Sequence, residues 1–480
     1  MMNISFELSM EPQGKRRILR PAGPPDGGYG WFIVLSTFLV FGLTFGVIKS
    51  FGVFFVEIQH YFATTATTSS WITSISVATV HFGAPVGSAL SAYFGHRPVV
   101  MAGGLLSSIG MVAGSYAQDM LQLYITVGFF TGLGYALTWT PTVTMLGWYF
   151  EKRRPVANAL ASAGECILTF ILTPSFQFMV DQYSWRGAML ILGALQLNLC
   201  LCGALLRPLN RHVPSKELVE NDCNELELLS QTHTDLKSSK NSSDSKKSDP
   251  LKVKITSYMD YTLIVNARFM VYTMFGVFAA LGFFAPALFL VPYARSQGVE
   301  EYQAAALMSI SAVLDLLGRL LFGWVANLRL VKTVHQLTVT VILLGIVLLL
   351  CPLATTFTQL ALFSAGYGLV FGATVSIHIT VLAEVVGVER LGSALGFFML
   401  IRSSGGLLGP PLAGIFIDKM SDYGAGFLMA GVALLVSALF LLVLHQMNKK
   451  WMEKGKDINL DNQKGCEDRF ENKNSNFGRS

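Results

Sequence analysis

The sequence is short of charged residues. Only 14% of its 480 residues are Asp, Glu, Lys or Arg, whereas a soluble domain carries about 25%. Hydrophobic residues make up 52% of the chain, and the mean hydropathy is +0.51. This composition excludes an ordinary soluble domain and is typical of a membrane protein.

The chain also lacks the short motifs of common enzymes and pumps. It has no Gly-x-x-x-x-Gly-Lys-Ser/Thr loop to hold ATP, which argues against a primary pump. No His/Cys cluster has metal-ligand spacing, and no Ser/His/Asp set lies in a soluble domain. We therefore predict a protein that is not an enzyme and uses no metal or cofactor.

Cysteine is scarce too. None of the six cysteines lies in a loop predicted to face the outside, so the sequence predicts no disulfide framework. Cys200 and Cys202 are two positions apart in an apolar helix and face different directions. We interpret them as packing residues rather than metal ligands.

Long apolar stretches are abundant. Each is about 20 residues long, enough to cross a hydrocarbon layer of about 30 Å. The predicted spans are 31–55, 71–92, 98–116, 121–146, 155–180, 187–206, 267–291, 302–326, 334–354, 358–382, 391–416 and 425–445. The first has no small-residue cleavage site, so we interpret it as a retained span rather than a signal peptide. The fold class predicted is an all-α membrane protein with twelve transmembrane helices in two six-helix halves.

Lysine and arginine are distributed unevenly between the loops. With the amino terminus inside, 29 of the 35 lie in inner segments, three lie in spans, and Arg186, Arg295 and Lys419 lie in outer loops. Such asymmetry predicts that both termini are cytoplasmic. The net charge of +5 then reflects cytoplasmic loops and not nucleic-acid binding.

One long polar segment separates the two helical halves, and another follows the second half. Both are polar and poor in aromatic residues, so we expect them to be disordered. The predicted organisation is an N-terminal segment (1–30), a six-helix bundle (31–206), a cytoplasmic linker (207–266), a second bundle (267–446) and a cytoplasmic tail (447–480).

A turn-rich motif, PPDGGYGW, occupies residues 24–31, just before the first span. On physical grounds it anchors the helix entry at the interface. In detail it resembles the opening signature of the monocarboxylate transporter family of the major facilitator superfamily. The stretch 149–157 (YFEKRRPVA), continuing to Ala163-Gly164, resembles the motif that leads into the family's fifth helix. WRG at 185–187 and GPP at 409–411 extend the resemblance to both halves.

The sequence also departs from that family pattern. Val156, Ala159 and Leu168 stand where the family usually has Leu, Gly and Gly, and Tyr29 where Trp is commoner. The resemblance implies two six-helix halves around a central cavity that opens alternately to each side of the membrane. Binding near the midplane between paired halves is a common transporter design.

Charged residues inside the predicted spans are the main candidates for a binding site. Asp315 and Arg319 are four residues apart and share one face of their helix. The planar guanidinium group of an arginine suits a carboxylate ligand, because it can donate two parallel hydrogen bonds to it. Burial disfavours the charged form of Asp315, so we expect it to take a proton under mildly acidic conditions and release Arg319 to the substrate. A purely structural ion pair is the alternative.

Lys49 lies about 27 Å along the first helix, which predicts a position in its outer half. It is either a lysine that snorkels to the interface or an outward-facing gate that attracts the anion or relays the proton. The resemblance implies that Lys49, Asp315 and Arg319 match the Lys, Asp and Arg of the family's site.

Other polar residues within the spans have less certain roles. Glu165 is predicted to reach Arg319, and Arg402 to bind substrate or to partner His81. The remaining candidates are either satisfied packing residues or selectivity residues: Asn158, Gln177, His378 and Glu384.

The predicted function is therefore proton-linked symport of a small monocarboxylate of the lactate, pyruvate or ketone-body type across the plasma membrane. A proton-independent uniporter or exchanger of a taurine- or creatine-like solute is the alternative, and a non-transporting sensor or scaffold is a third possibility. The predicted partners are the organic anion, the proton and the lipid bilayer. The resemblance also implies a single-span immunoglobulin-like chaperone.

Overall fold

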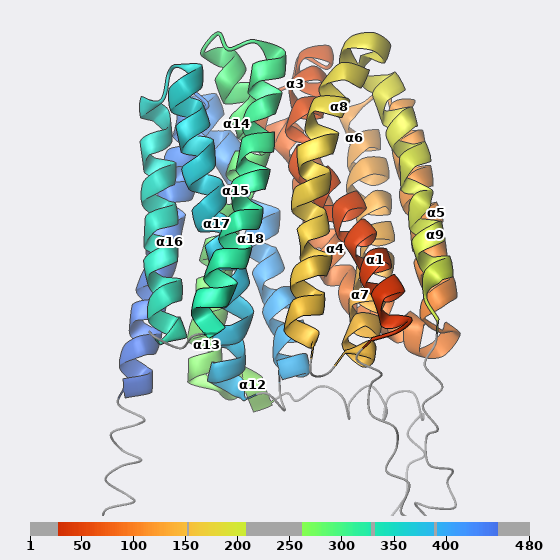
Figure 1. Ribbon diagram of the computed structural model, residues 1–480. Coiled ribbons are helices and arrows are strands. Elements are labelled where there is room, and N and C mark those ends of the chain that lie inside the picture. Colours follow the sequence, from red (N-terminus) through yellow and green to blue (C-terminus); the bar gives the residue numbers. More distant parts are fainter. Residues whose placement is uncertain (1–26, 151–152, 208–261, 328–331, 388–390, 450–480) are drawn as a thin grey trace, which may run out of the picture.

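The computed structural model describes residues 27–150, 153–207, 262–327, 332–387 and 391–449. Eleven helices in these ranges are long and apolar enough to span a membrane. One of them, Val156–Leu205, has two arms, because Ser184 (φ 60°, ψ 170°) breaks the helical path and the chain turns back (Figure 1). Its arms account for the fifth and sixth predicted spans, so all twelve predicted crossings are found.

The first half consists of the helices up to Leu205, coloured red to yellow in Figure 1. They are α1 (Gly30–Phe41), η1 (Gly42–Gly46), α2 (Val47–Ser50), α3 (Gly52–Tyr61), α4 (Ala66–Phe94), α5 (His96–Ser115), α6 (Met120–Leu123), η2 (Tyr124–Phe130), α7 (Thr131–Tyr149), α8 (Arg154–Gln196) and α9 (Asn198–Leu205).

The second half, green to blue, lies beside the first (Figure 1). It contains α12 (Thr262–Val265), α13 (Ala267–Phe283), α14 (Ala285–Ser296), α15 (Glu301–Asn327), α16 (Thr333–Leu350), η3 (Cys351–Leu353), α17 (Phe357–Val386), α18 (Leu391–Met420) and the last helix, Gly424–Lys449. The greater parts of the predicted segments 1–30, 207–266 and 447–480 lie outside the described residues.

Local signals in the sequence set several helix ends. Thr65 caps α4 by accepting a hydrogen bond from the Thr68 amide, and Thr356 with Gln359 forms a reciprocal capping box on α17. Gly95 follows α4 with φ 92°, a conformation that glycine adopts without strain. Polar and glycine residues thus end helices whose interiors are apolar.

Glycines also permit close helix packing inside the second half. A Cβ atom at Gly368 would lie 2.2 Å from the Ser311 carbonyl oxygen, and one at Gly372 would lie 2.1 Å from that of Asp315. A Cβ at Gly318 would lie 2.2 Å from the Leu369 carbonyl oxygen. The backbones of α15 and α17 are therefore in direct contact, with no room for larger residues.

Besides contacts midway along the helices, a second group of polar contacts joins the halves at one end of the bundle. We name this the far end, because it is opposite the linker end, where α1 begins and α9 ends. There Asp418 accepts hydrogen bonds from the backbone amides of Ala66 (2.9 Å) and Thr67 (3.0 Å), and Arg295 pairs with Glu57 (2.9 Å). Two more hydrogen bonds join the halves at this end: Tyr423 to Gln59 (2.8 Å) and Gln177 to Glu301 (3.3 Å). The halves are thus fastened together at the far end.

Candidate functional site

Four charged side chains from both halves meet midway along the helices; we call them the ion cluster. Lys49 Nζ lies 2.7 Å from Glu165 Oε1 and 2.8 Å from Asp315 Oδ2. Arg319 binds the same two carboxylates, with Nε 2.8 Å from Asp315 Oδ1 and Nη2 3.0 Å from Glu165 Oε2. Each cation therefore contacts both anions, and the four formal charges cancel.

Helix packing brings these four residues together. Asp315 and Arg319 are one turn apart on α15, as the sequence spacing predicts. Gly46 lets the first helix approach α8, since a Cβ there would lie 3.3 Å from the Glu165 carbonyl oxygen. Gly372 similarly lets α17 approach Asp315. Close glycine contacts thus hold the backbone beside each of the two carboxylates.

The ion cluster is shielded from solvent. The side chain of Asp315 is 3% exposed and that of Arg319 is 8% exposed, while Glu165 and Lys49 reach 12% and 19%. Removing one member of such a buried pair leaves its partner's charge uncompensated. Removing any one of the four charges is therefore expected to destabilise the arrangement of the other three.

The structure places Lys49 nearer to the middle of its helix than the predicted span 31–55 implies. The first helix was expected to end near residue 55, but helical structure continues through α3 to Tyr61. Lys49 consequently lies just beyond the middle of this rod, in the half farther from the linker end, as predicted. It bonds to Asp315, so the snorkelling alternative is wrong. The predicted contact between Glu165 and Arg319 is confirmed.

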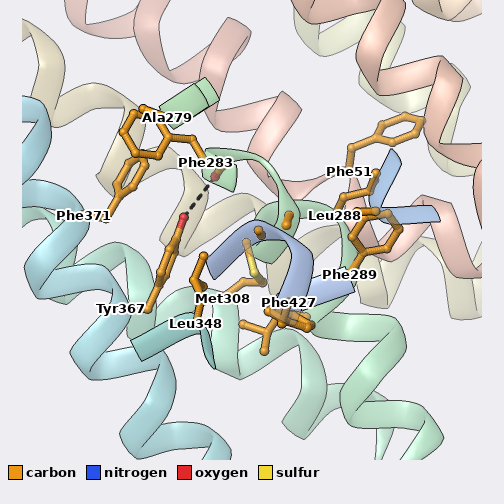
Figure 2. Close-up of a cluster of buried hydrophobic side chains, with 14 of the residues drawn as sticks. Phe51, Ala279, Phe283, Leu288, Phe289, Met308, Leu348, Tyr367, Phe371 and Phe427 are labelled. Atoms are coloured by element: carbon orange, nitrogen blue, oxygen red, sulfur yellow. Dashed lines mark hydrogen bonds between the residues drawn. The ribbon is translucent and has the colours of Figure 1, made fainter. Parts of the chain in front are cut away.

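An aromatic wall borders the ion cluster. Lys49 Nζ lies 4.7 Å from the centroid of the Phe371 ring. Phe371 contacts Phe283 edge to face, with centroids 5.5 Å apart, and stacks on Tyr367 at the same centroid separation. Figure 2 shows the three rings side by side, with Tyr367 donating a hydrogen bond to the Phe283 carbonyl oxygen (3.2 Å). Sequence reasoning missed this wall, although the i, i+4 spacing of Tyr367 and Phe371 was a usable signal.

Arg402 lies at the opposite edge of the aromatic wall. Its guanidinium carbon is 5.4 Å from the Phe283 ring centroid, and one nitrogen contacts Met399 Sδ at 4.0 Å. No carboxylate lies within 4.0 Å of it in the part of the chain that the structure describes. It is close enough to His81 and His378 to interact with both electrostatically, but no hydrogen bond joins it to His81 in the described residues. The predicted partnership with His81 stays a prediction.

The two histidines near Arg402 are tied to their own helices. His81 Nδ1 lies 2.8 Å from the Val77 carbonyl oxygen, and His378 Nδ1 lies 2.7 Å from that of Val375. A carbonyl oxygen only accepts, so Nδ1 is the donor in both rings. Neither imidazole needs a charge to make these bonds, and the neutral form retains Nε2 as an acceptor.

The other polar candidates are dispersed. Glu384 accepts a hydrogen bond from the Thr333 hydroxyl, and Gln177 bonds to Asp181 (2.9 Å) as well as to Glu301. Asn158 is exposed near the linker end of α8. None of these three contacts the ion cluster in the described residues, so of the secondary candidates only Glu165 belongs to it.

Comparison with known proteins places the chain in a family. A family model described as the Major Facilitator Superfamily matches residues 34–347 and 273–461. Monocarboxylate transporter 2 from Homo sapiens is 37% identical over 436 residues, which cover 90% of this chain and 88% of that protein. This chain belongs to the monocarboxylate transporter family of the major facilitator superfamily.

Other members of the monocarboxylate transporter family show comparable similarity. Monocarboxylate transporter 13 from Bos taurus is 38% identical over 427 residues, covering 88% of this chain and 91% of that protein. Monocarboxylate transporter 12 from Mus musculus is 38% identical over 430 residues, with 88% and 86% covered. Membership confirms the predicted major facilitator fold and the prediction of a multi-pass membrane transporter rather than an enzyme.

Proposed function

We propose that this monocarboxylate transporter family member moves a small monocarboxylate of the lactate, pyruvate or ketone-body type together with a proton. Transport occurs by alternating access, in which the halves open in turn toward each side of the membrane. The observation that carries the proposal is the ion cluster. It joins both halves, it is buried, and it contains protonatable carboxylates beside cations that can bind an organic anion.

The proposed coupling follows from the contacts of Asp315. A proton on this carboxyl group neutralises it and weakens its bonds to Lys49 and Arg319. The cluster then carries a net positive charge, which a substrate carboxylate compensates. One proton and one monoanion cross together, so the loaded site stays neutral. In this scheme Lys49, Arg319 and Arg402 bind the substrate, while Asp315 and Lys49 couple it to the proton.

The test is substrate-driven acidification of the cytosol in cells that express the protein, recorded with a pH-sensitive fluorophore. In Asp315→Asn cells, we expect uptake to lose its response to an imposed pH gradient and to fall roughly tenfold, because a charged hydrogen-bond acceptor is lost. Asp119→Asn, at an exposed site in front of α6, serves as the control. Uptake by the unsubstituted protein that ignores the pH gradient would reject coupling but not transport.

A second candidate function is proton-independent uniport or exchange of a taurine- or creatine-like solute. The observation that favours it is the second carboxylate, Glu165, which together with Asp315 already neutralises Lys49 and Arg319. Two acidic groups can also receive the cationic end of a zwitterion. Isotope flux without movement of protons, in a panel of lactate, pyruvate, hydroxybutyrate, taurine and creatine, would select this alternative.

The proposed location is the plasma membrane, with both termini in the cytoplasm. The uneven distribution of lysine and arginine supports this orientation. We also propose a single-span immunoglobulin-like partner that assists delivery to the surface. Labelling of terminal epitope tags in intact and permeabilised cells tests the orientation, and co-purification from solubilised membranes tests the partner.

A further inference from the structure

A second group of basic side chains lies at the linker end of the second half, where α16 meets the last helix. The rings of His335 on α16 and His445 on the last helix touch edge to face, with centroids 4.2 Å apart. Lys332 and Lys449 are close enough to His445 to interact with it electrostatically. We call these four side chains the basic cluster. They lie apart from the ion cluster and take no part in the proposed coupling.

Close packing of the two helices gives the basic cluster a fixed frame. A Cβ atom at Gly345 of α16 would lie 3.2 Å from the Gly431 carbonyl oxygen, and one at Gly431 would lie 3.0 Å from that of Gly345. The two backbones are therefore in contact inside the membrane, and from there both helices reach the linker end. Figure 1 shows α16 and the blue last helix at one edge of the bundle, away from the first half.

An exposed apolar face leads along this helix pair to the basic cluster. His335 is exposed, and the same face of α16 continues with Val339, Leu343, Ile346 and Leu350, which are exposed too. The last helix exposes Val432, Leu439, Leu442 and Val443. Exposed apolar side chains on membrane-spanning helices lie against lipid tails. Acyl chains can thus cover this face while the headgroup of the same lipid reaches the basic cluster.

We infer that the basic cluster binds the headgroup of an anionic phospholipid whose acyl chains lie on the apolar face of α16 and the last helix. A soluble phosphate ester would meet the same positive charges, but it would leave the apolar face unused. The proposed orientation puts the lipid in the cytoplasmic leaflet, which carries a negative surface potential. The inference goes beyond the proposed function, because binding of this lipid requires no transport.

The two imidazoles make the site respond to pH. Histidine is the side chain whose charge ordinarily changes between pH 5 and pH 8. Protonation of both rings raises the basic cluster from two positive charges to four. The charged neighbours that the structure describes are the two lysines and Glu384 of α17, which offsets one positive charge through its hydrogen bond to the Thr333 hydroxyl. Because an anionic headgroup relieves the repulsion between protonated rings, lipid and protons each favour the binding of the other.

The experiment measures lipid binding to the purified full-length protein in a non-ionic detergent. EDTA is present, so that no metal ion joins the two imidazoles. The melting temperature is recorded against the concentration of phosphatidylglycerol, whose phosphodiester keeps its charge in this pH range, and of phosphatidylcholine with the same chains. Phosphatidylglycerol should raise the melting temperature, and phosphatidylcholine should leave it nearly unchanged.

Two pairs of substitutions test the cluster itself. Lys332→Gln combined with Lys449→Gln should weaken phosphatidylglycerol binding roughly thirtyfold, because each basic residue at the membrane surface contributes about fivefold. The unsubstituted protein should bind this lipid roughly fivefold or more tightly at about pH 5.5 than at about pH 8. His335→Gln combined with His445→Gln should remove that difference.

Arg97→Gln is the matched control, because it removes a cation from an exposed site at the linker end of α5 in the first half. It should leave the affinity unchanged. The inference is overturned by equal stabilisation with both lipids, by an unaltered affinity in the lysine variant, or by an equal loss with Arg97→Gln. Full competition by glycerol 3-phosphate would assign the site to a soluble ester instead, and a pH response that survives histidine replacement would reject the role of the imidazoles. The assay reports binding alone, so none of these results decides whether the protein transports a monocarboxylate.

Discussion

Replacement of Asp418 by alanine should open the far end of the protein. This carboxylate belongs to α18 in the second half, and it accepts hydrogen bonds from the first two backbone amides of α4 in the first half. It also accepts one from the Thr67 hydroxyl. The amides at the start of a helix have no partner within the helix and carry partial positive charge. Asp418 therefore acts as a cap supplied by the other half.

The expected effect can be worked out from these three bonds. A hydrogen bond to a charged group contributes about 1.5–3 kcal/mol when shielded, and exposure to water reduces each to under about 1 kcal/mol. Asp418 is exposed, so we take about 2 kcal/mol for the three together. The closed far end should then lose about thirtyfold in its population relative to the open one.

Reaction of a buried cysteine measures this opening. Ser74 is fully buried on α4, and it shares a helix face with Thr67 and Val77, which contact α18 through Gly414 and Gly406. A Ser74→Cys variant should react with a membrane-impermeant maleimide only while the far end is open. Adding Asp418→Ala should raise the labelling rate on intact cells by roughly ten- to thirtyfold.

An unchanged labelling rate in the double variant would refute the reasoning. Lys419→Ala is the matched control, because it alters the next residue without removing a contact between the halves in the described structure. An equal rise with this control would indicate general loosening rather than loss of the cap. Asp418→Ala without the introduced cysteine gives the background reaction of the native cysteines.

Two further predictions concern the support of the ion cluster. Gly372→Ala should lower the melting temperature and the surface amount sharply, because its Cβ would lie 2.1 Å from the Asp315 carbonyl oxygen. The control Gly366→Ala, on the same helix with no atom within 4 Å of the new Cβ, should leave both unchanged. Equal melting temperatures of the two variants would contradict the packing argument. Phe371→Leu should lower the free energy of unfolding by about 1–2 kcal/mol, because it removes the ring beside Lys49. Thermal unfolding in detergent measures this loss, and an unaltered unfolding curve would show that the contact contributes little.

The helices could be predicted from the sequence, because the lipid bilayer imposes a strong pattern of apolar runs and polar ends on a chain that spans it. The predicted span 98–116 corresponds to His96–Ser115, and 425–445 to Gly424–Lys449. An apolar run must cover the hydrocarbon layer, and polar residues must mark its ends. The pairing of Asp315 with Arg319 was equally accessible, because both lie on one helix.

Contacts between distant helices were harder to predict. Spacing along one helix says nothing about which face meets another helix, so the approach of Phe283 to Arg402 and of Phe371 to Lys49 was missed. The depth of Lys49 within its helix depends on where that helix ends. A length count assumes where a helix ends, and the continuation to Tyr61 moves the middle of the rod toward this lysine. Glu165 was placed correctly only with the help of the neighbouring helices that the family resemblance implies.

The membership of the ion cluster has a consequence for the motion of the halves. Lys49 and Glu165 come from the first half and pair with each other, and Asp315 and Arg319 come from the second and do likewise. In the proposed alternating-access cycle, each half keeps one acid and one base in mutual contact when the halves separate. Within the ion cluster, the conformational change would then break only the two ion pairs between the halves, Lys49–Asp315 and Arg319–Glu165. No ion of the cluster would be left unpaired in the membrane interior, which keeps the free-energy barrier between the two open states low.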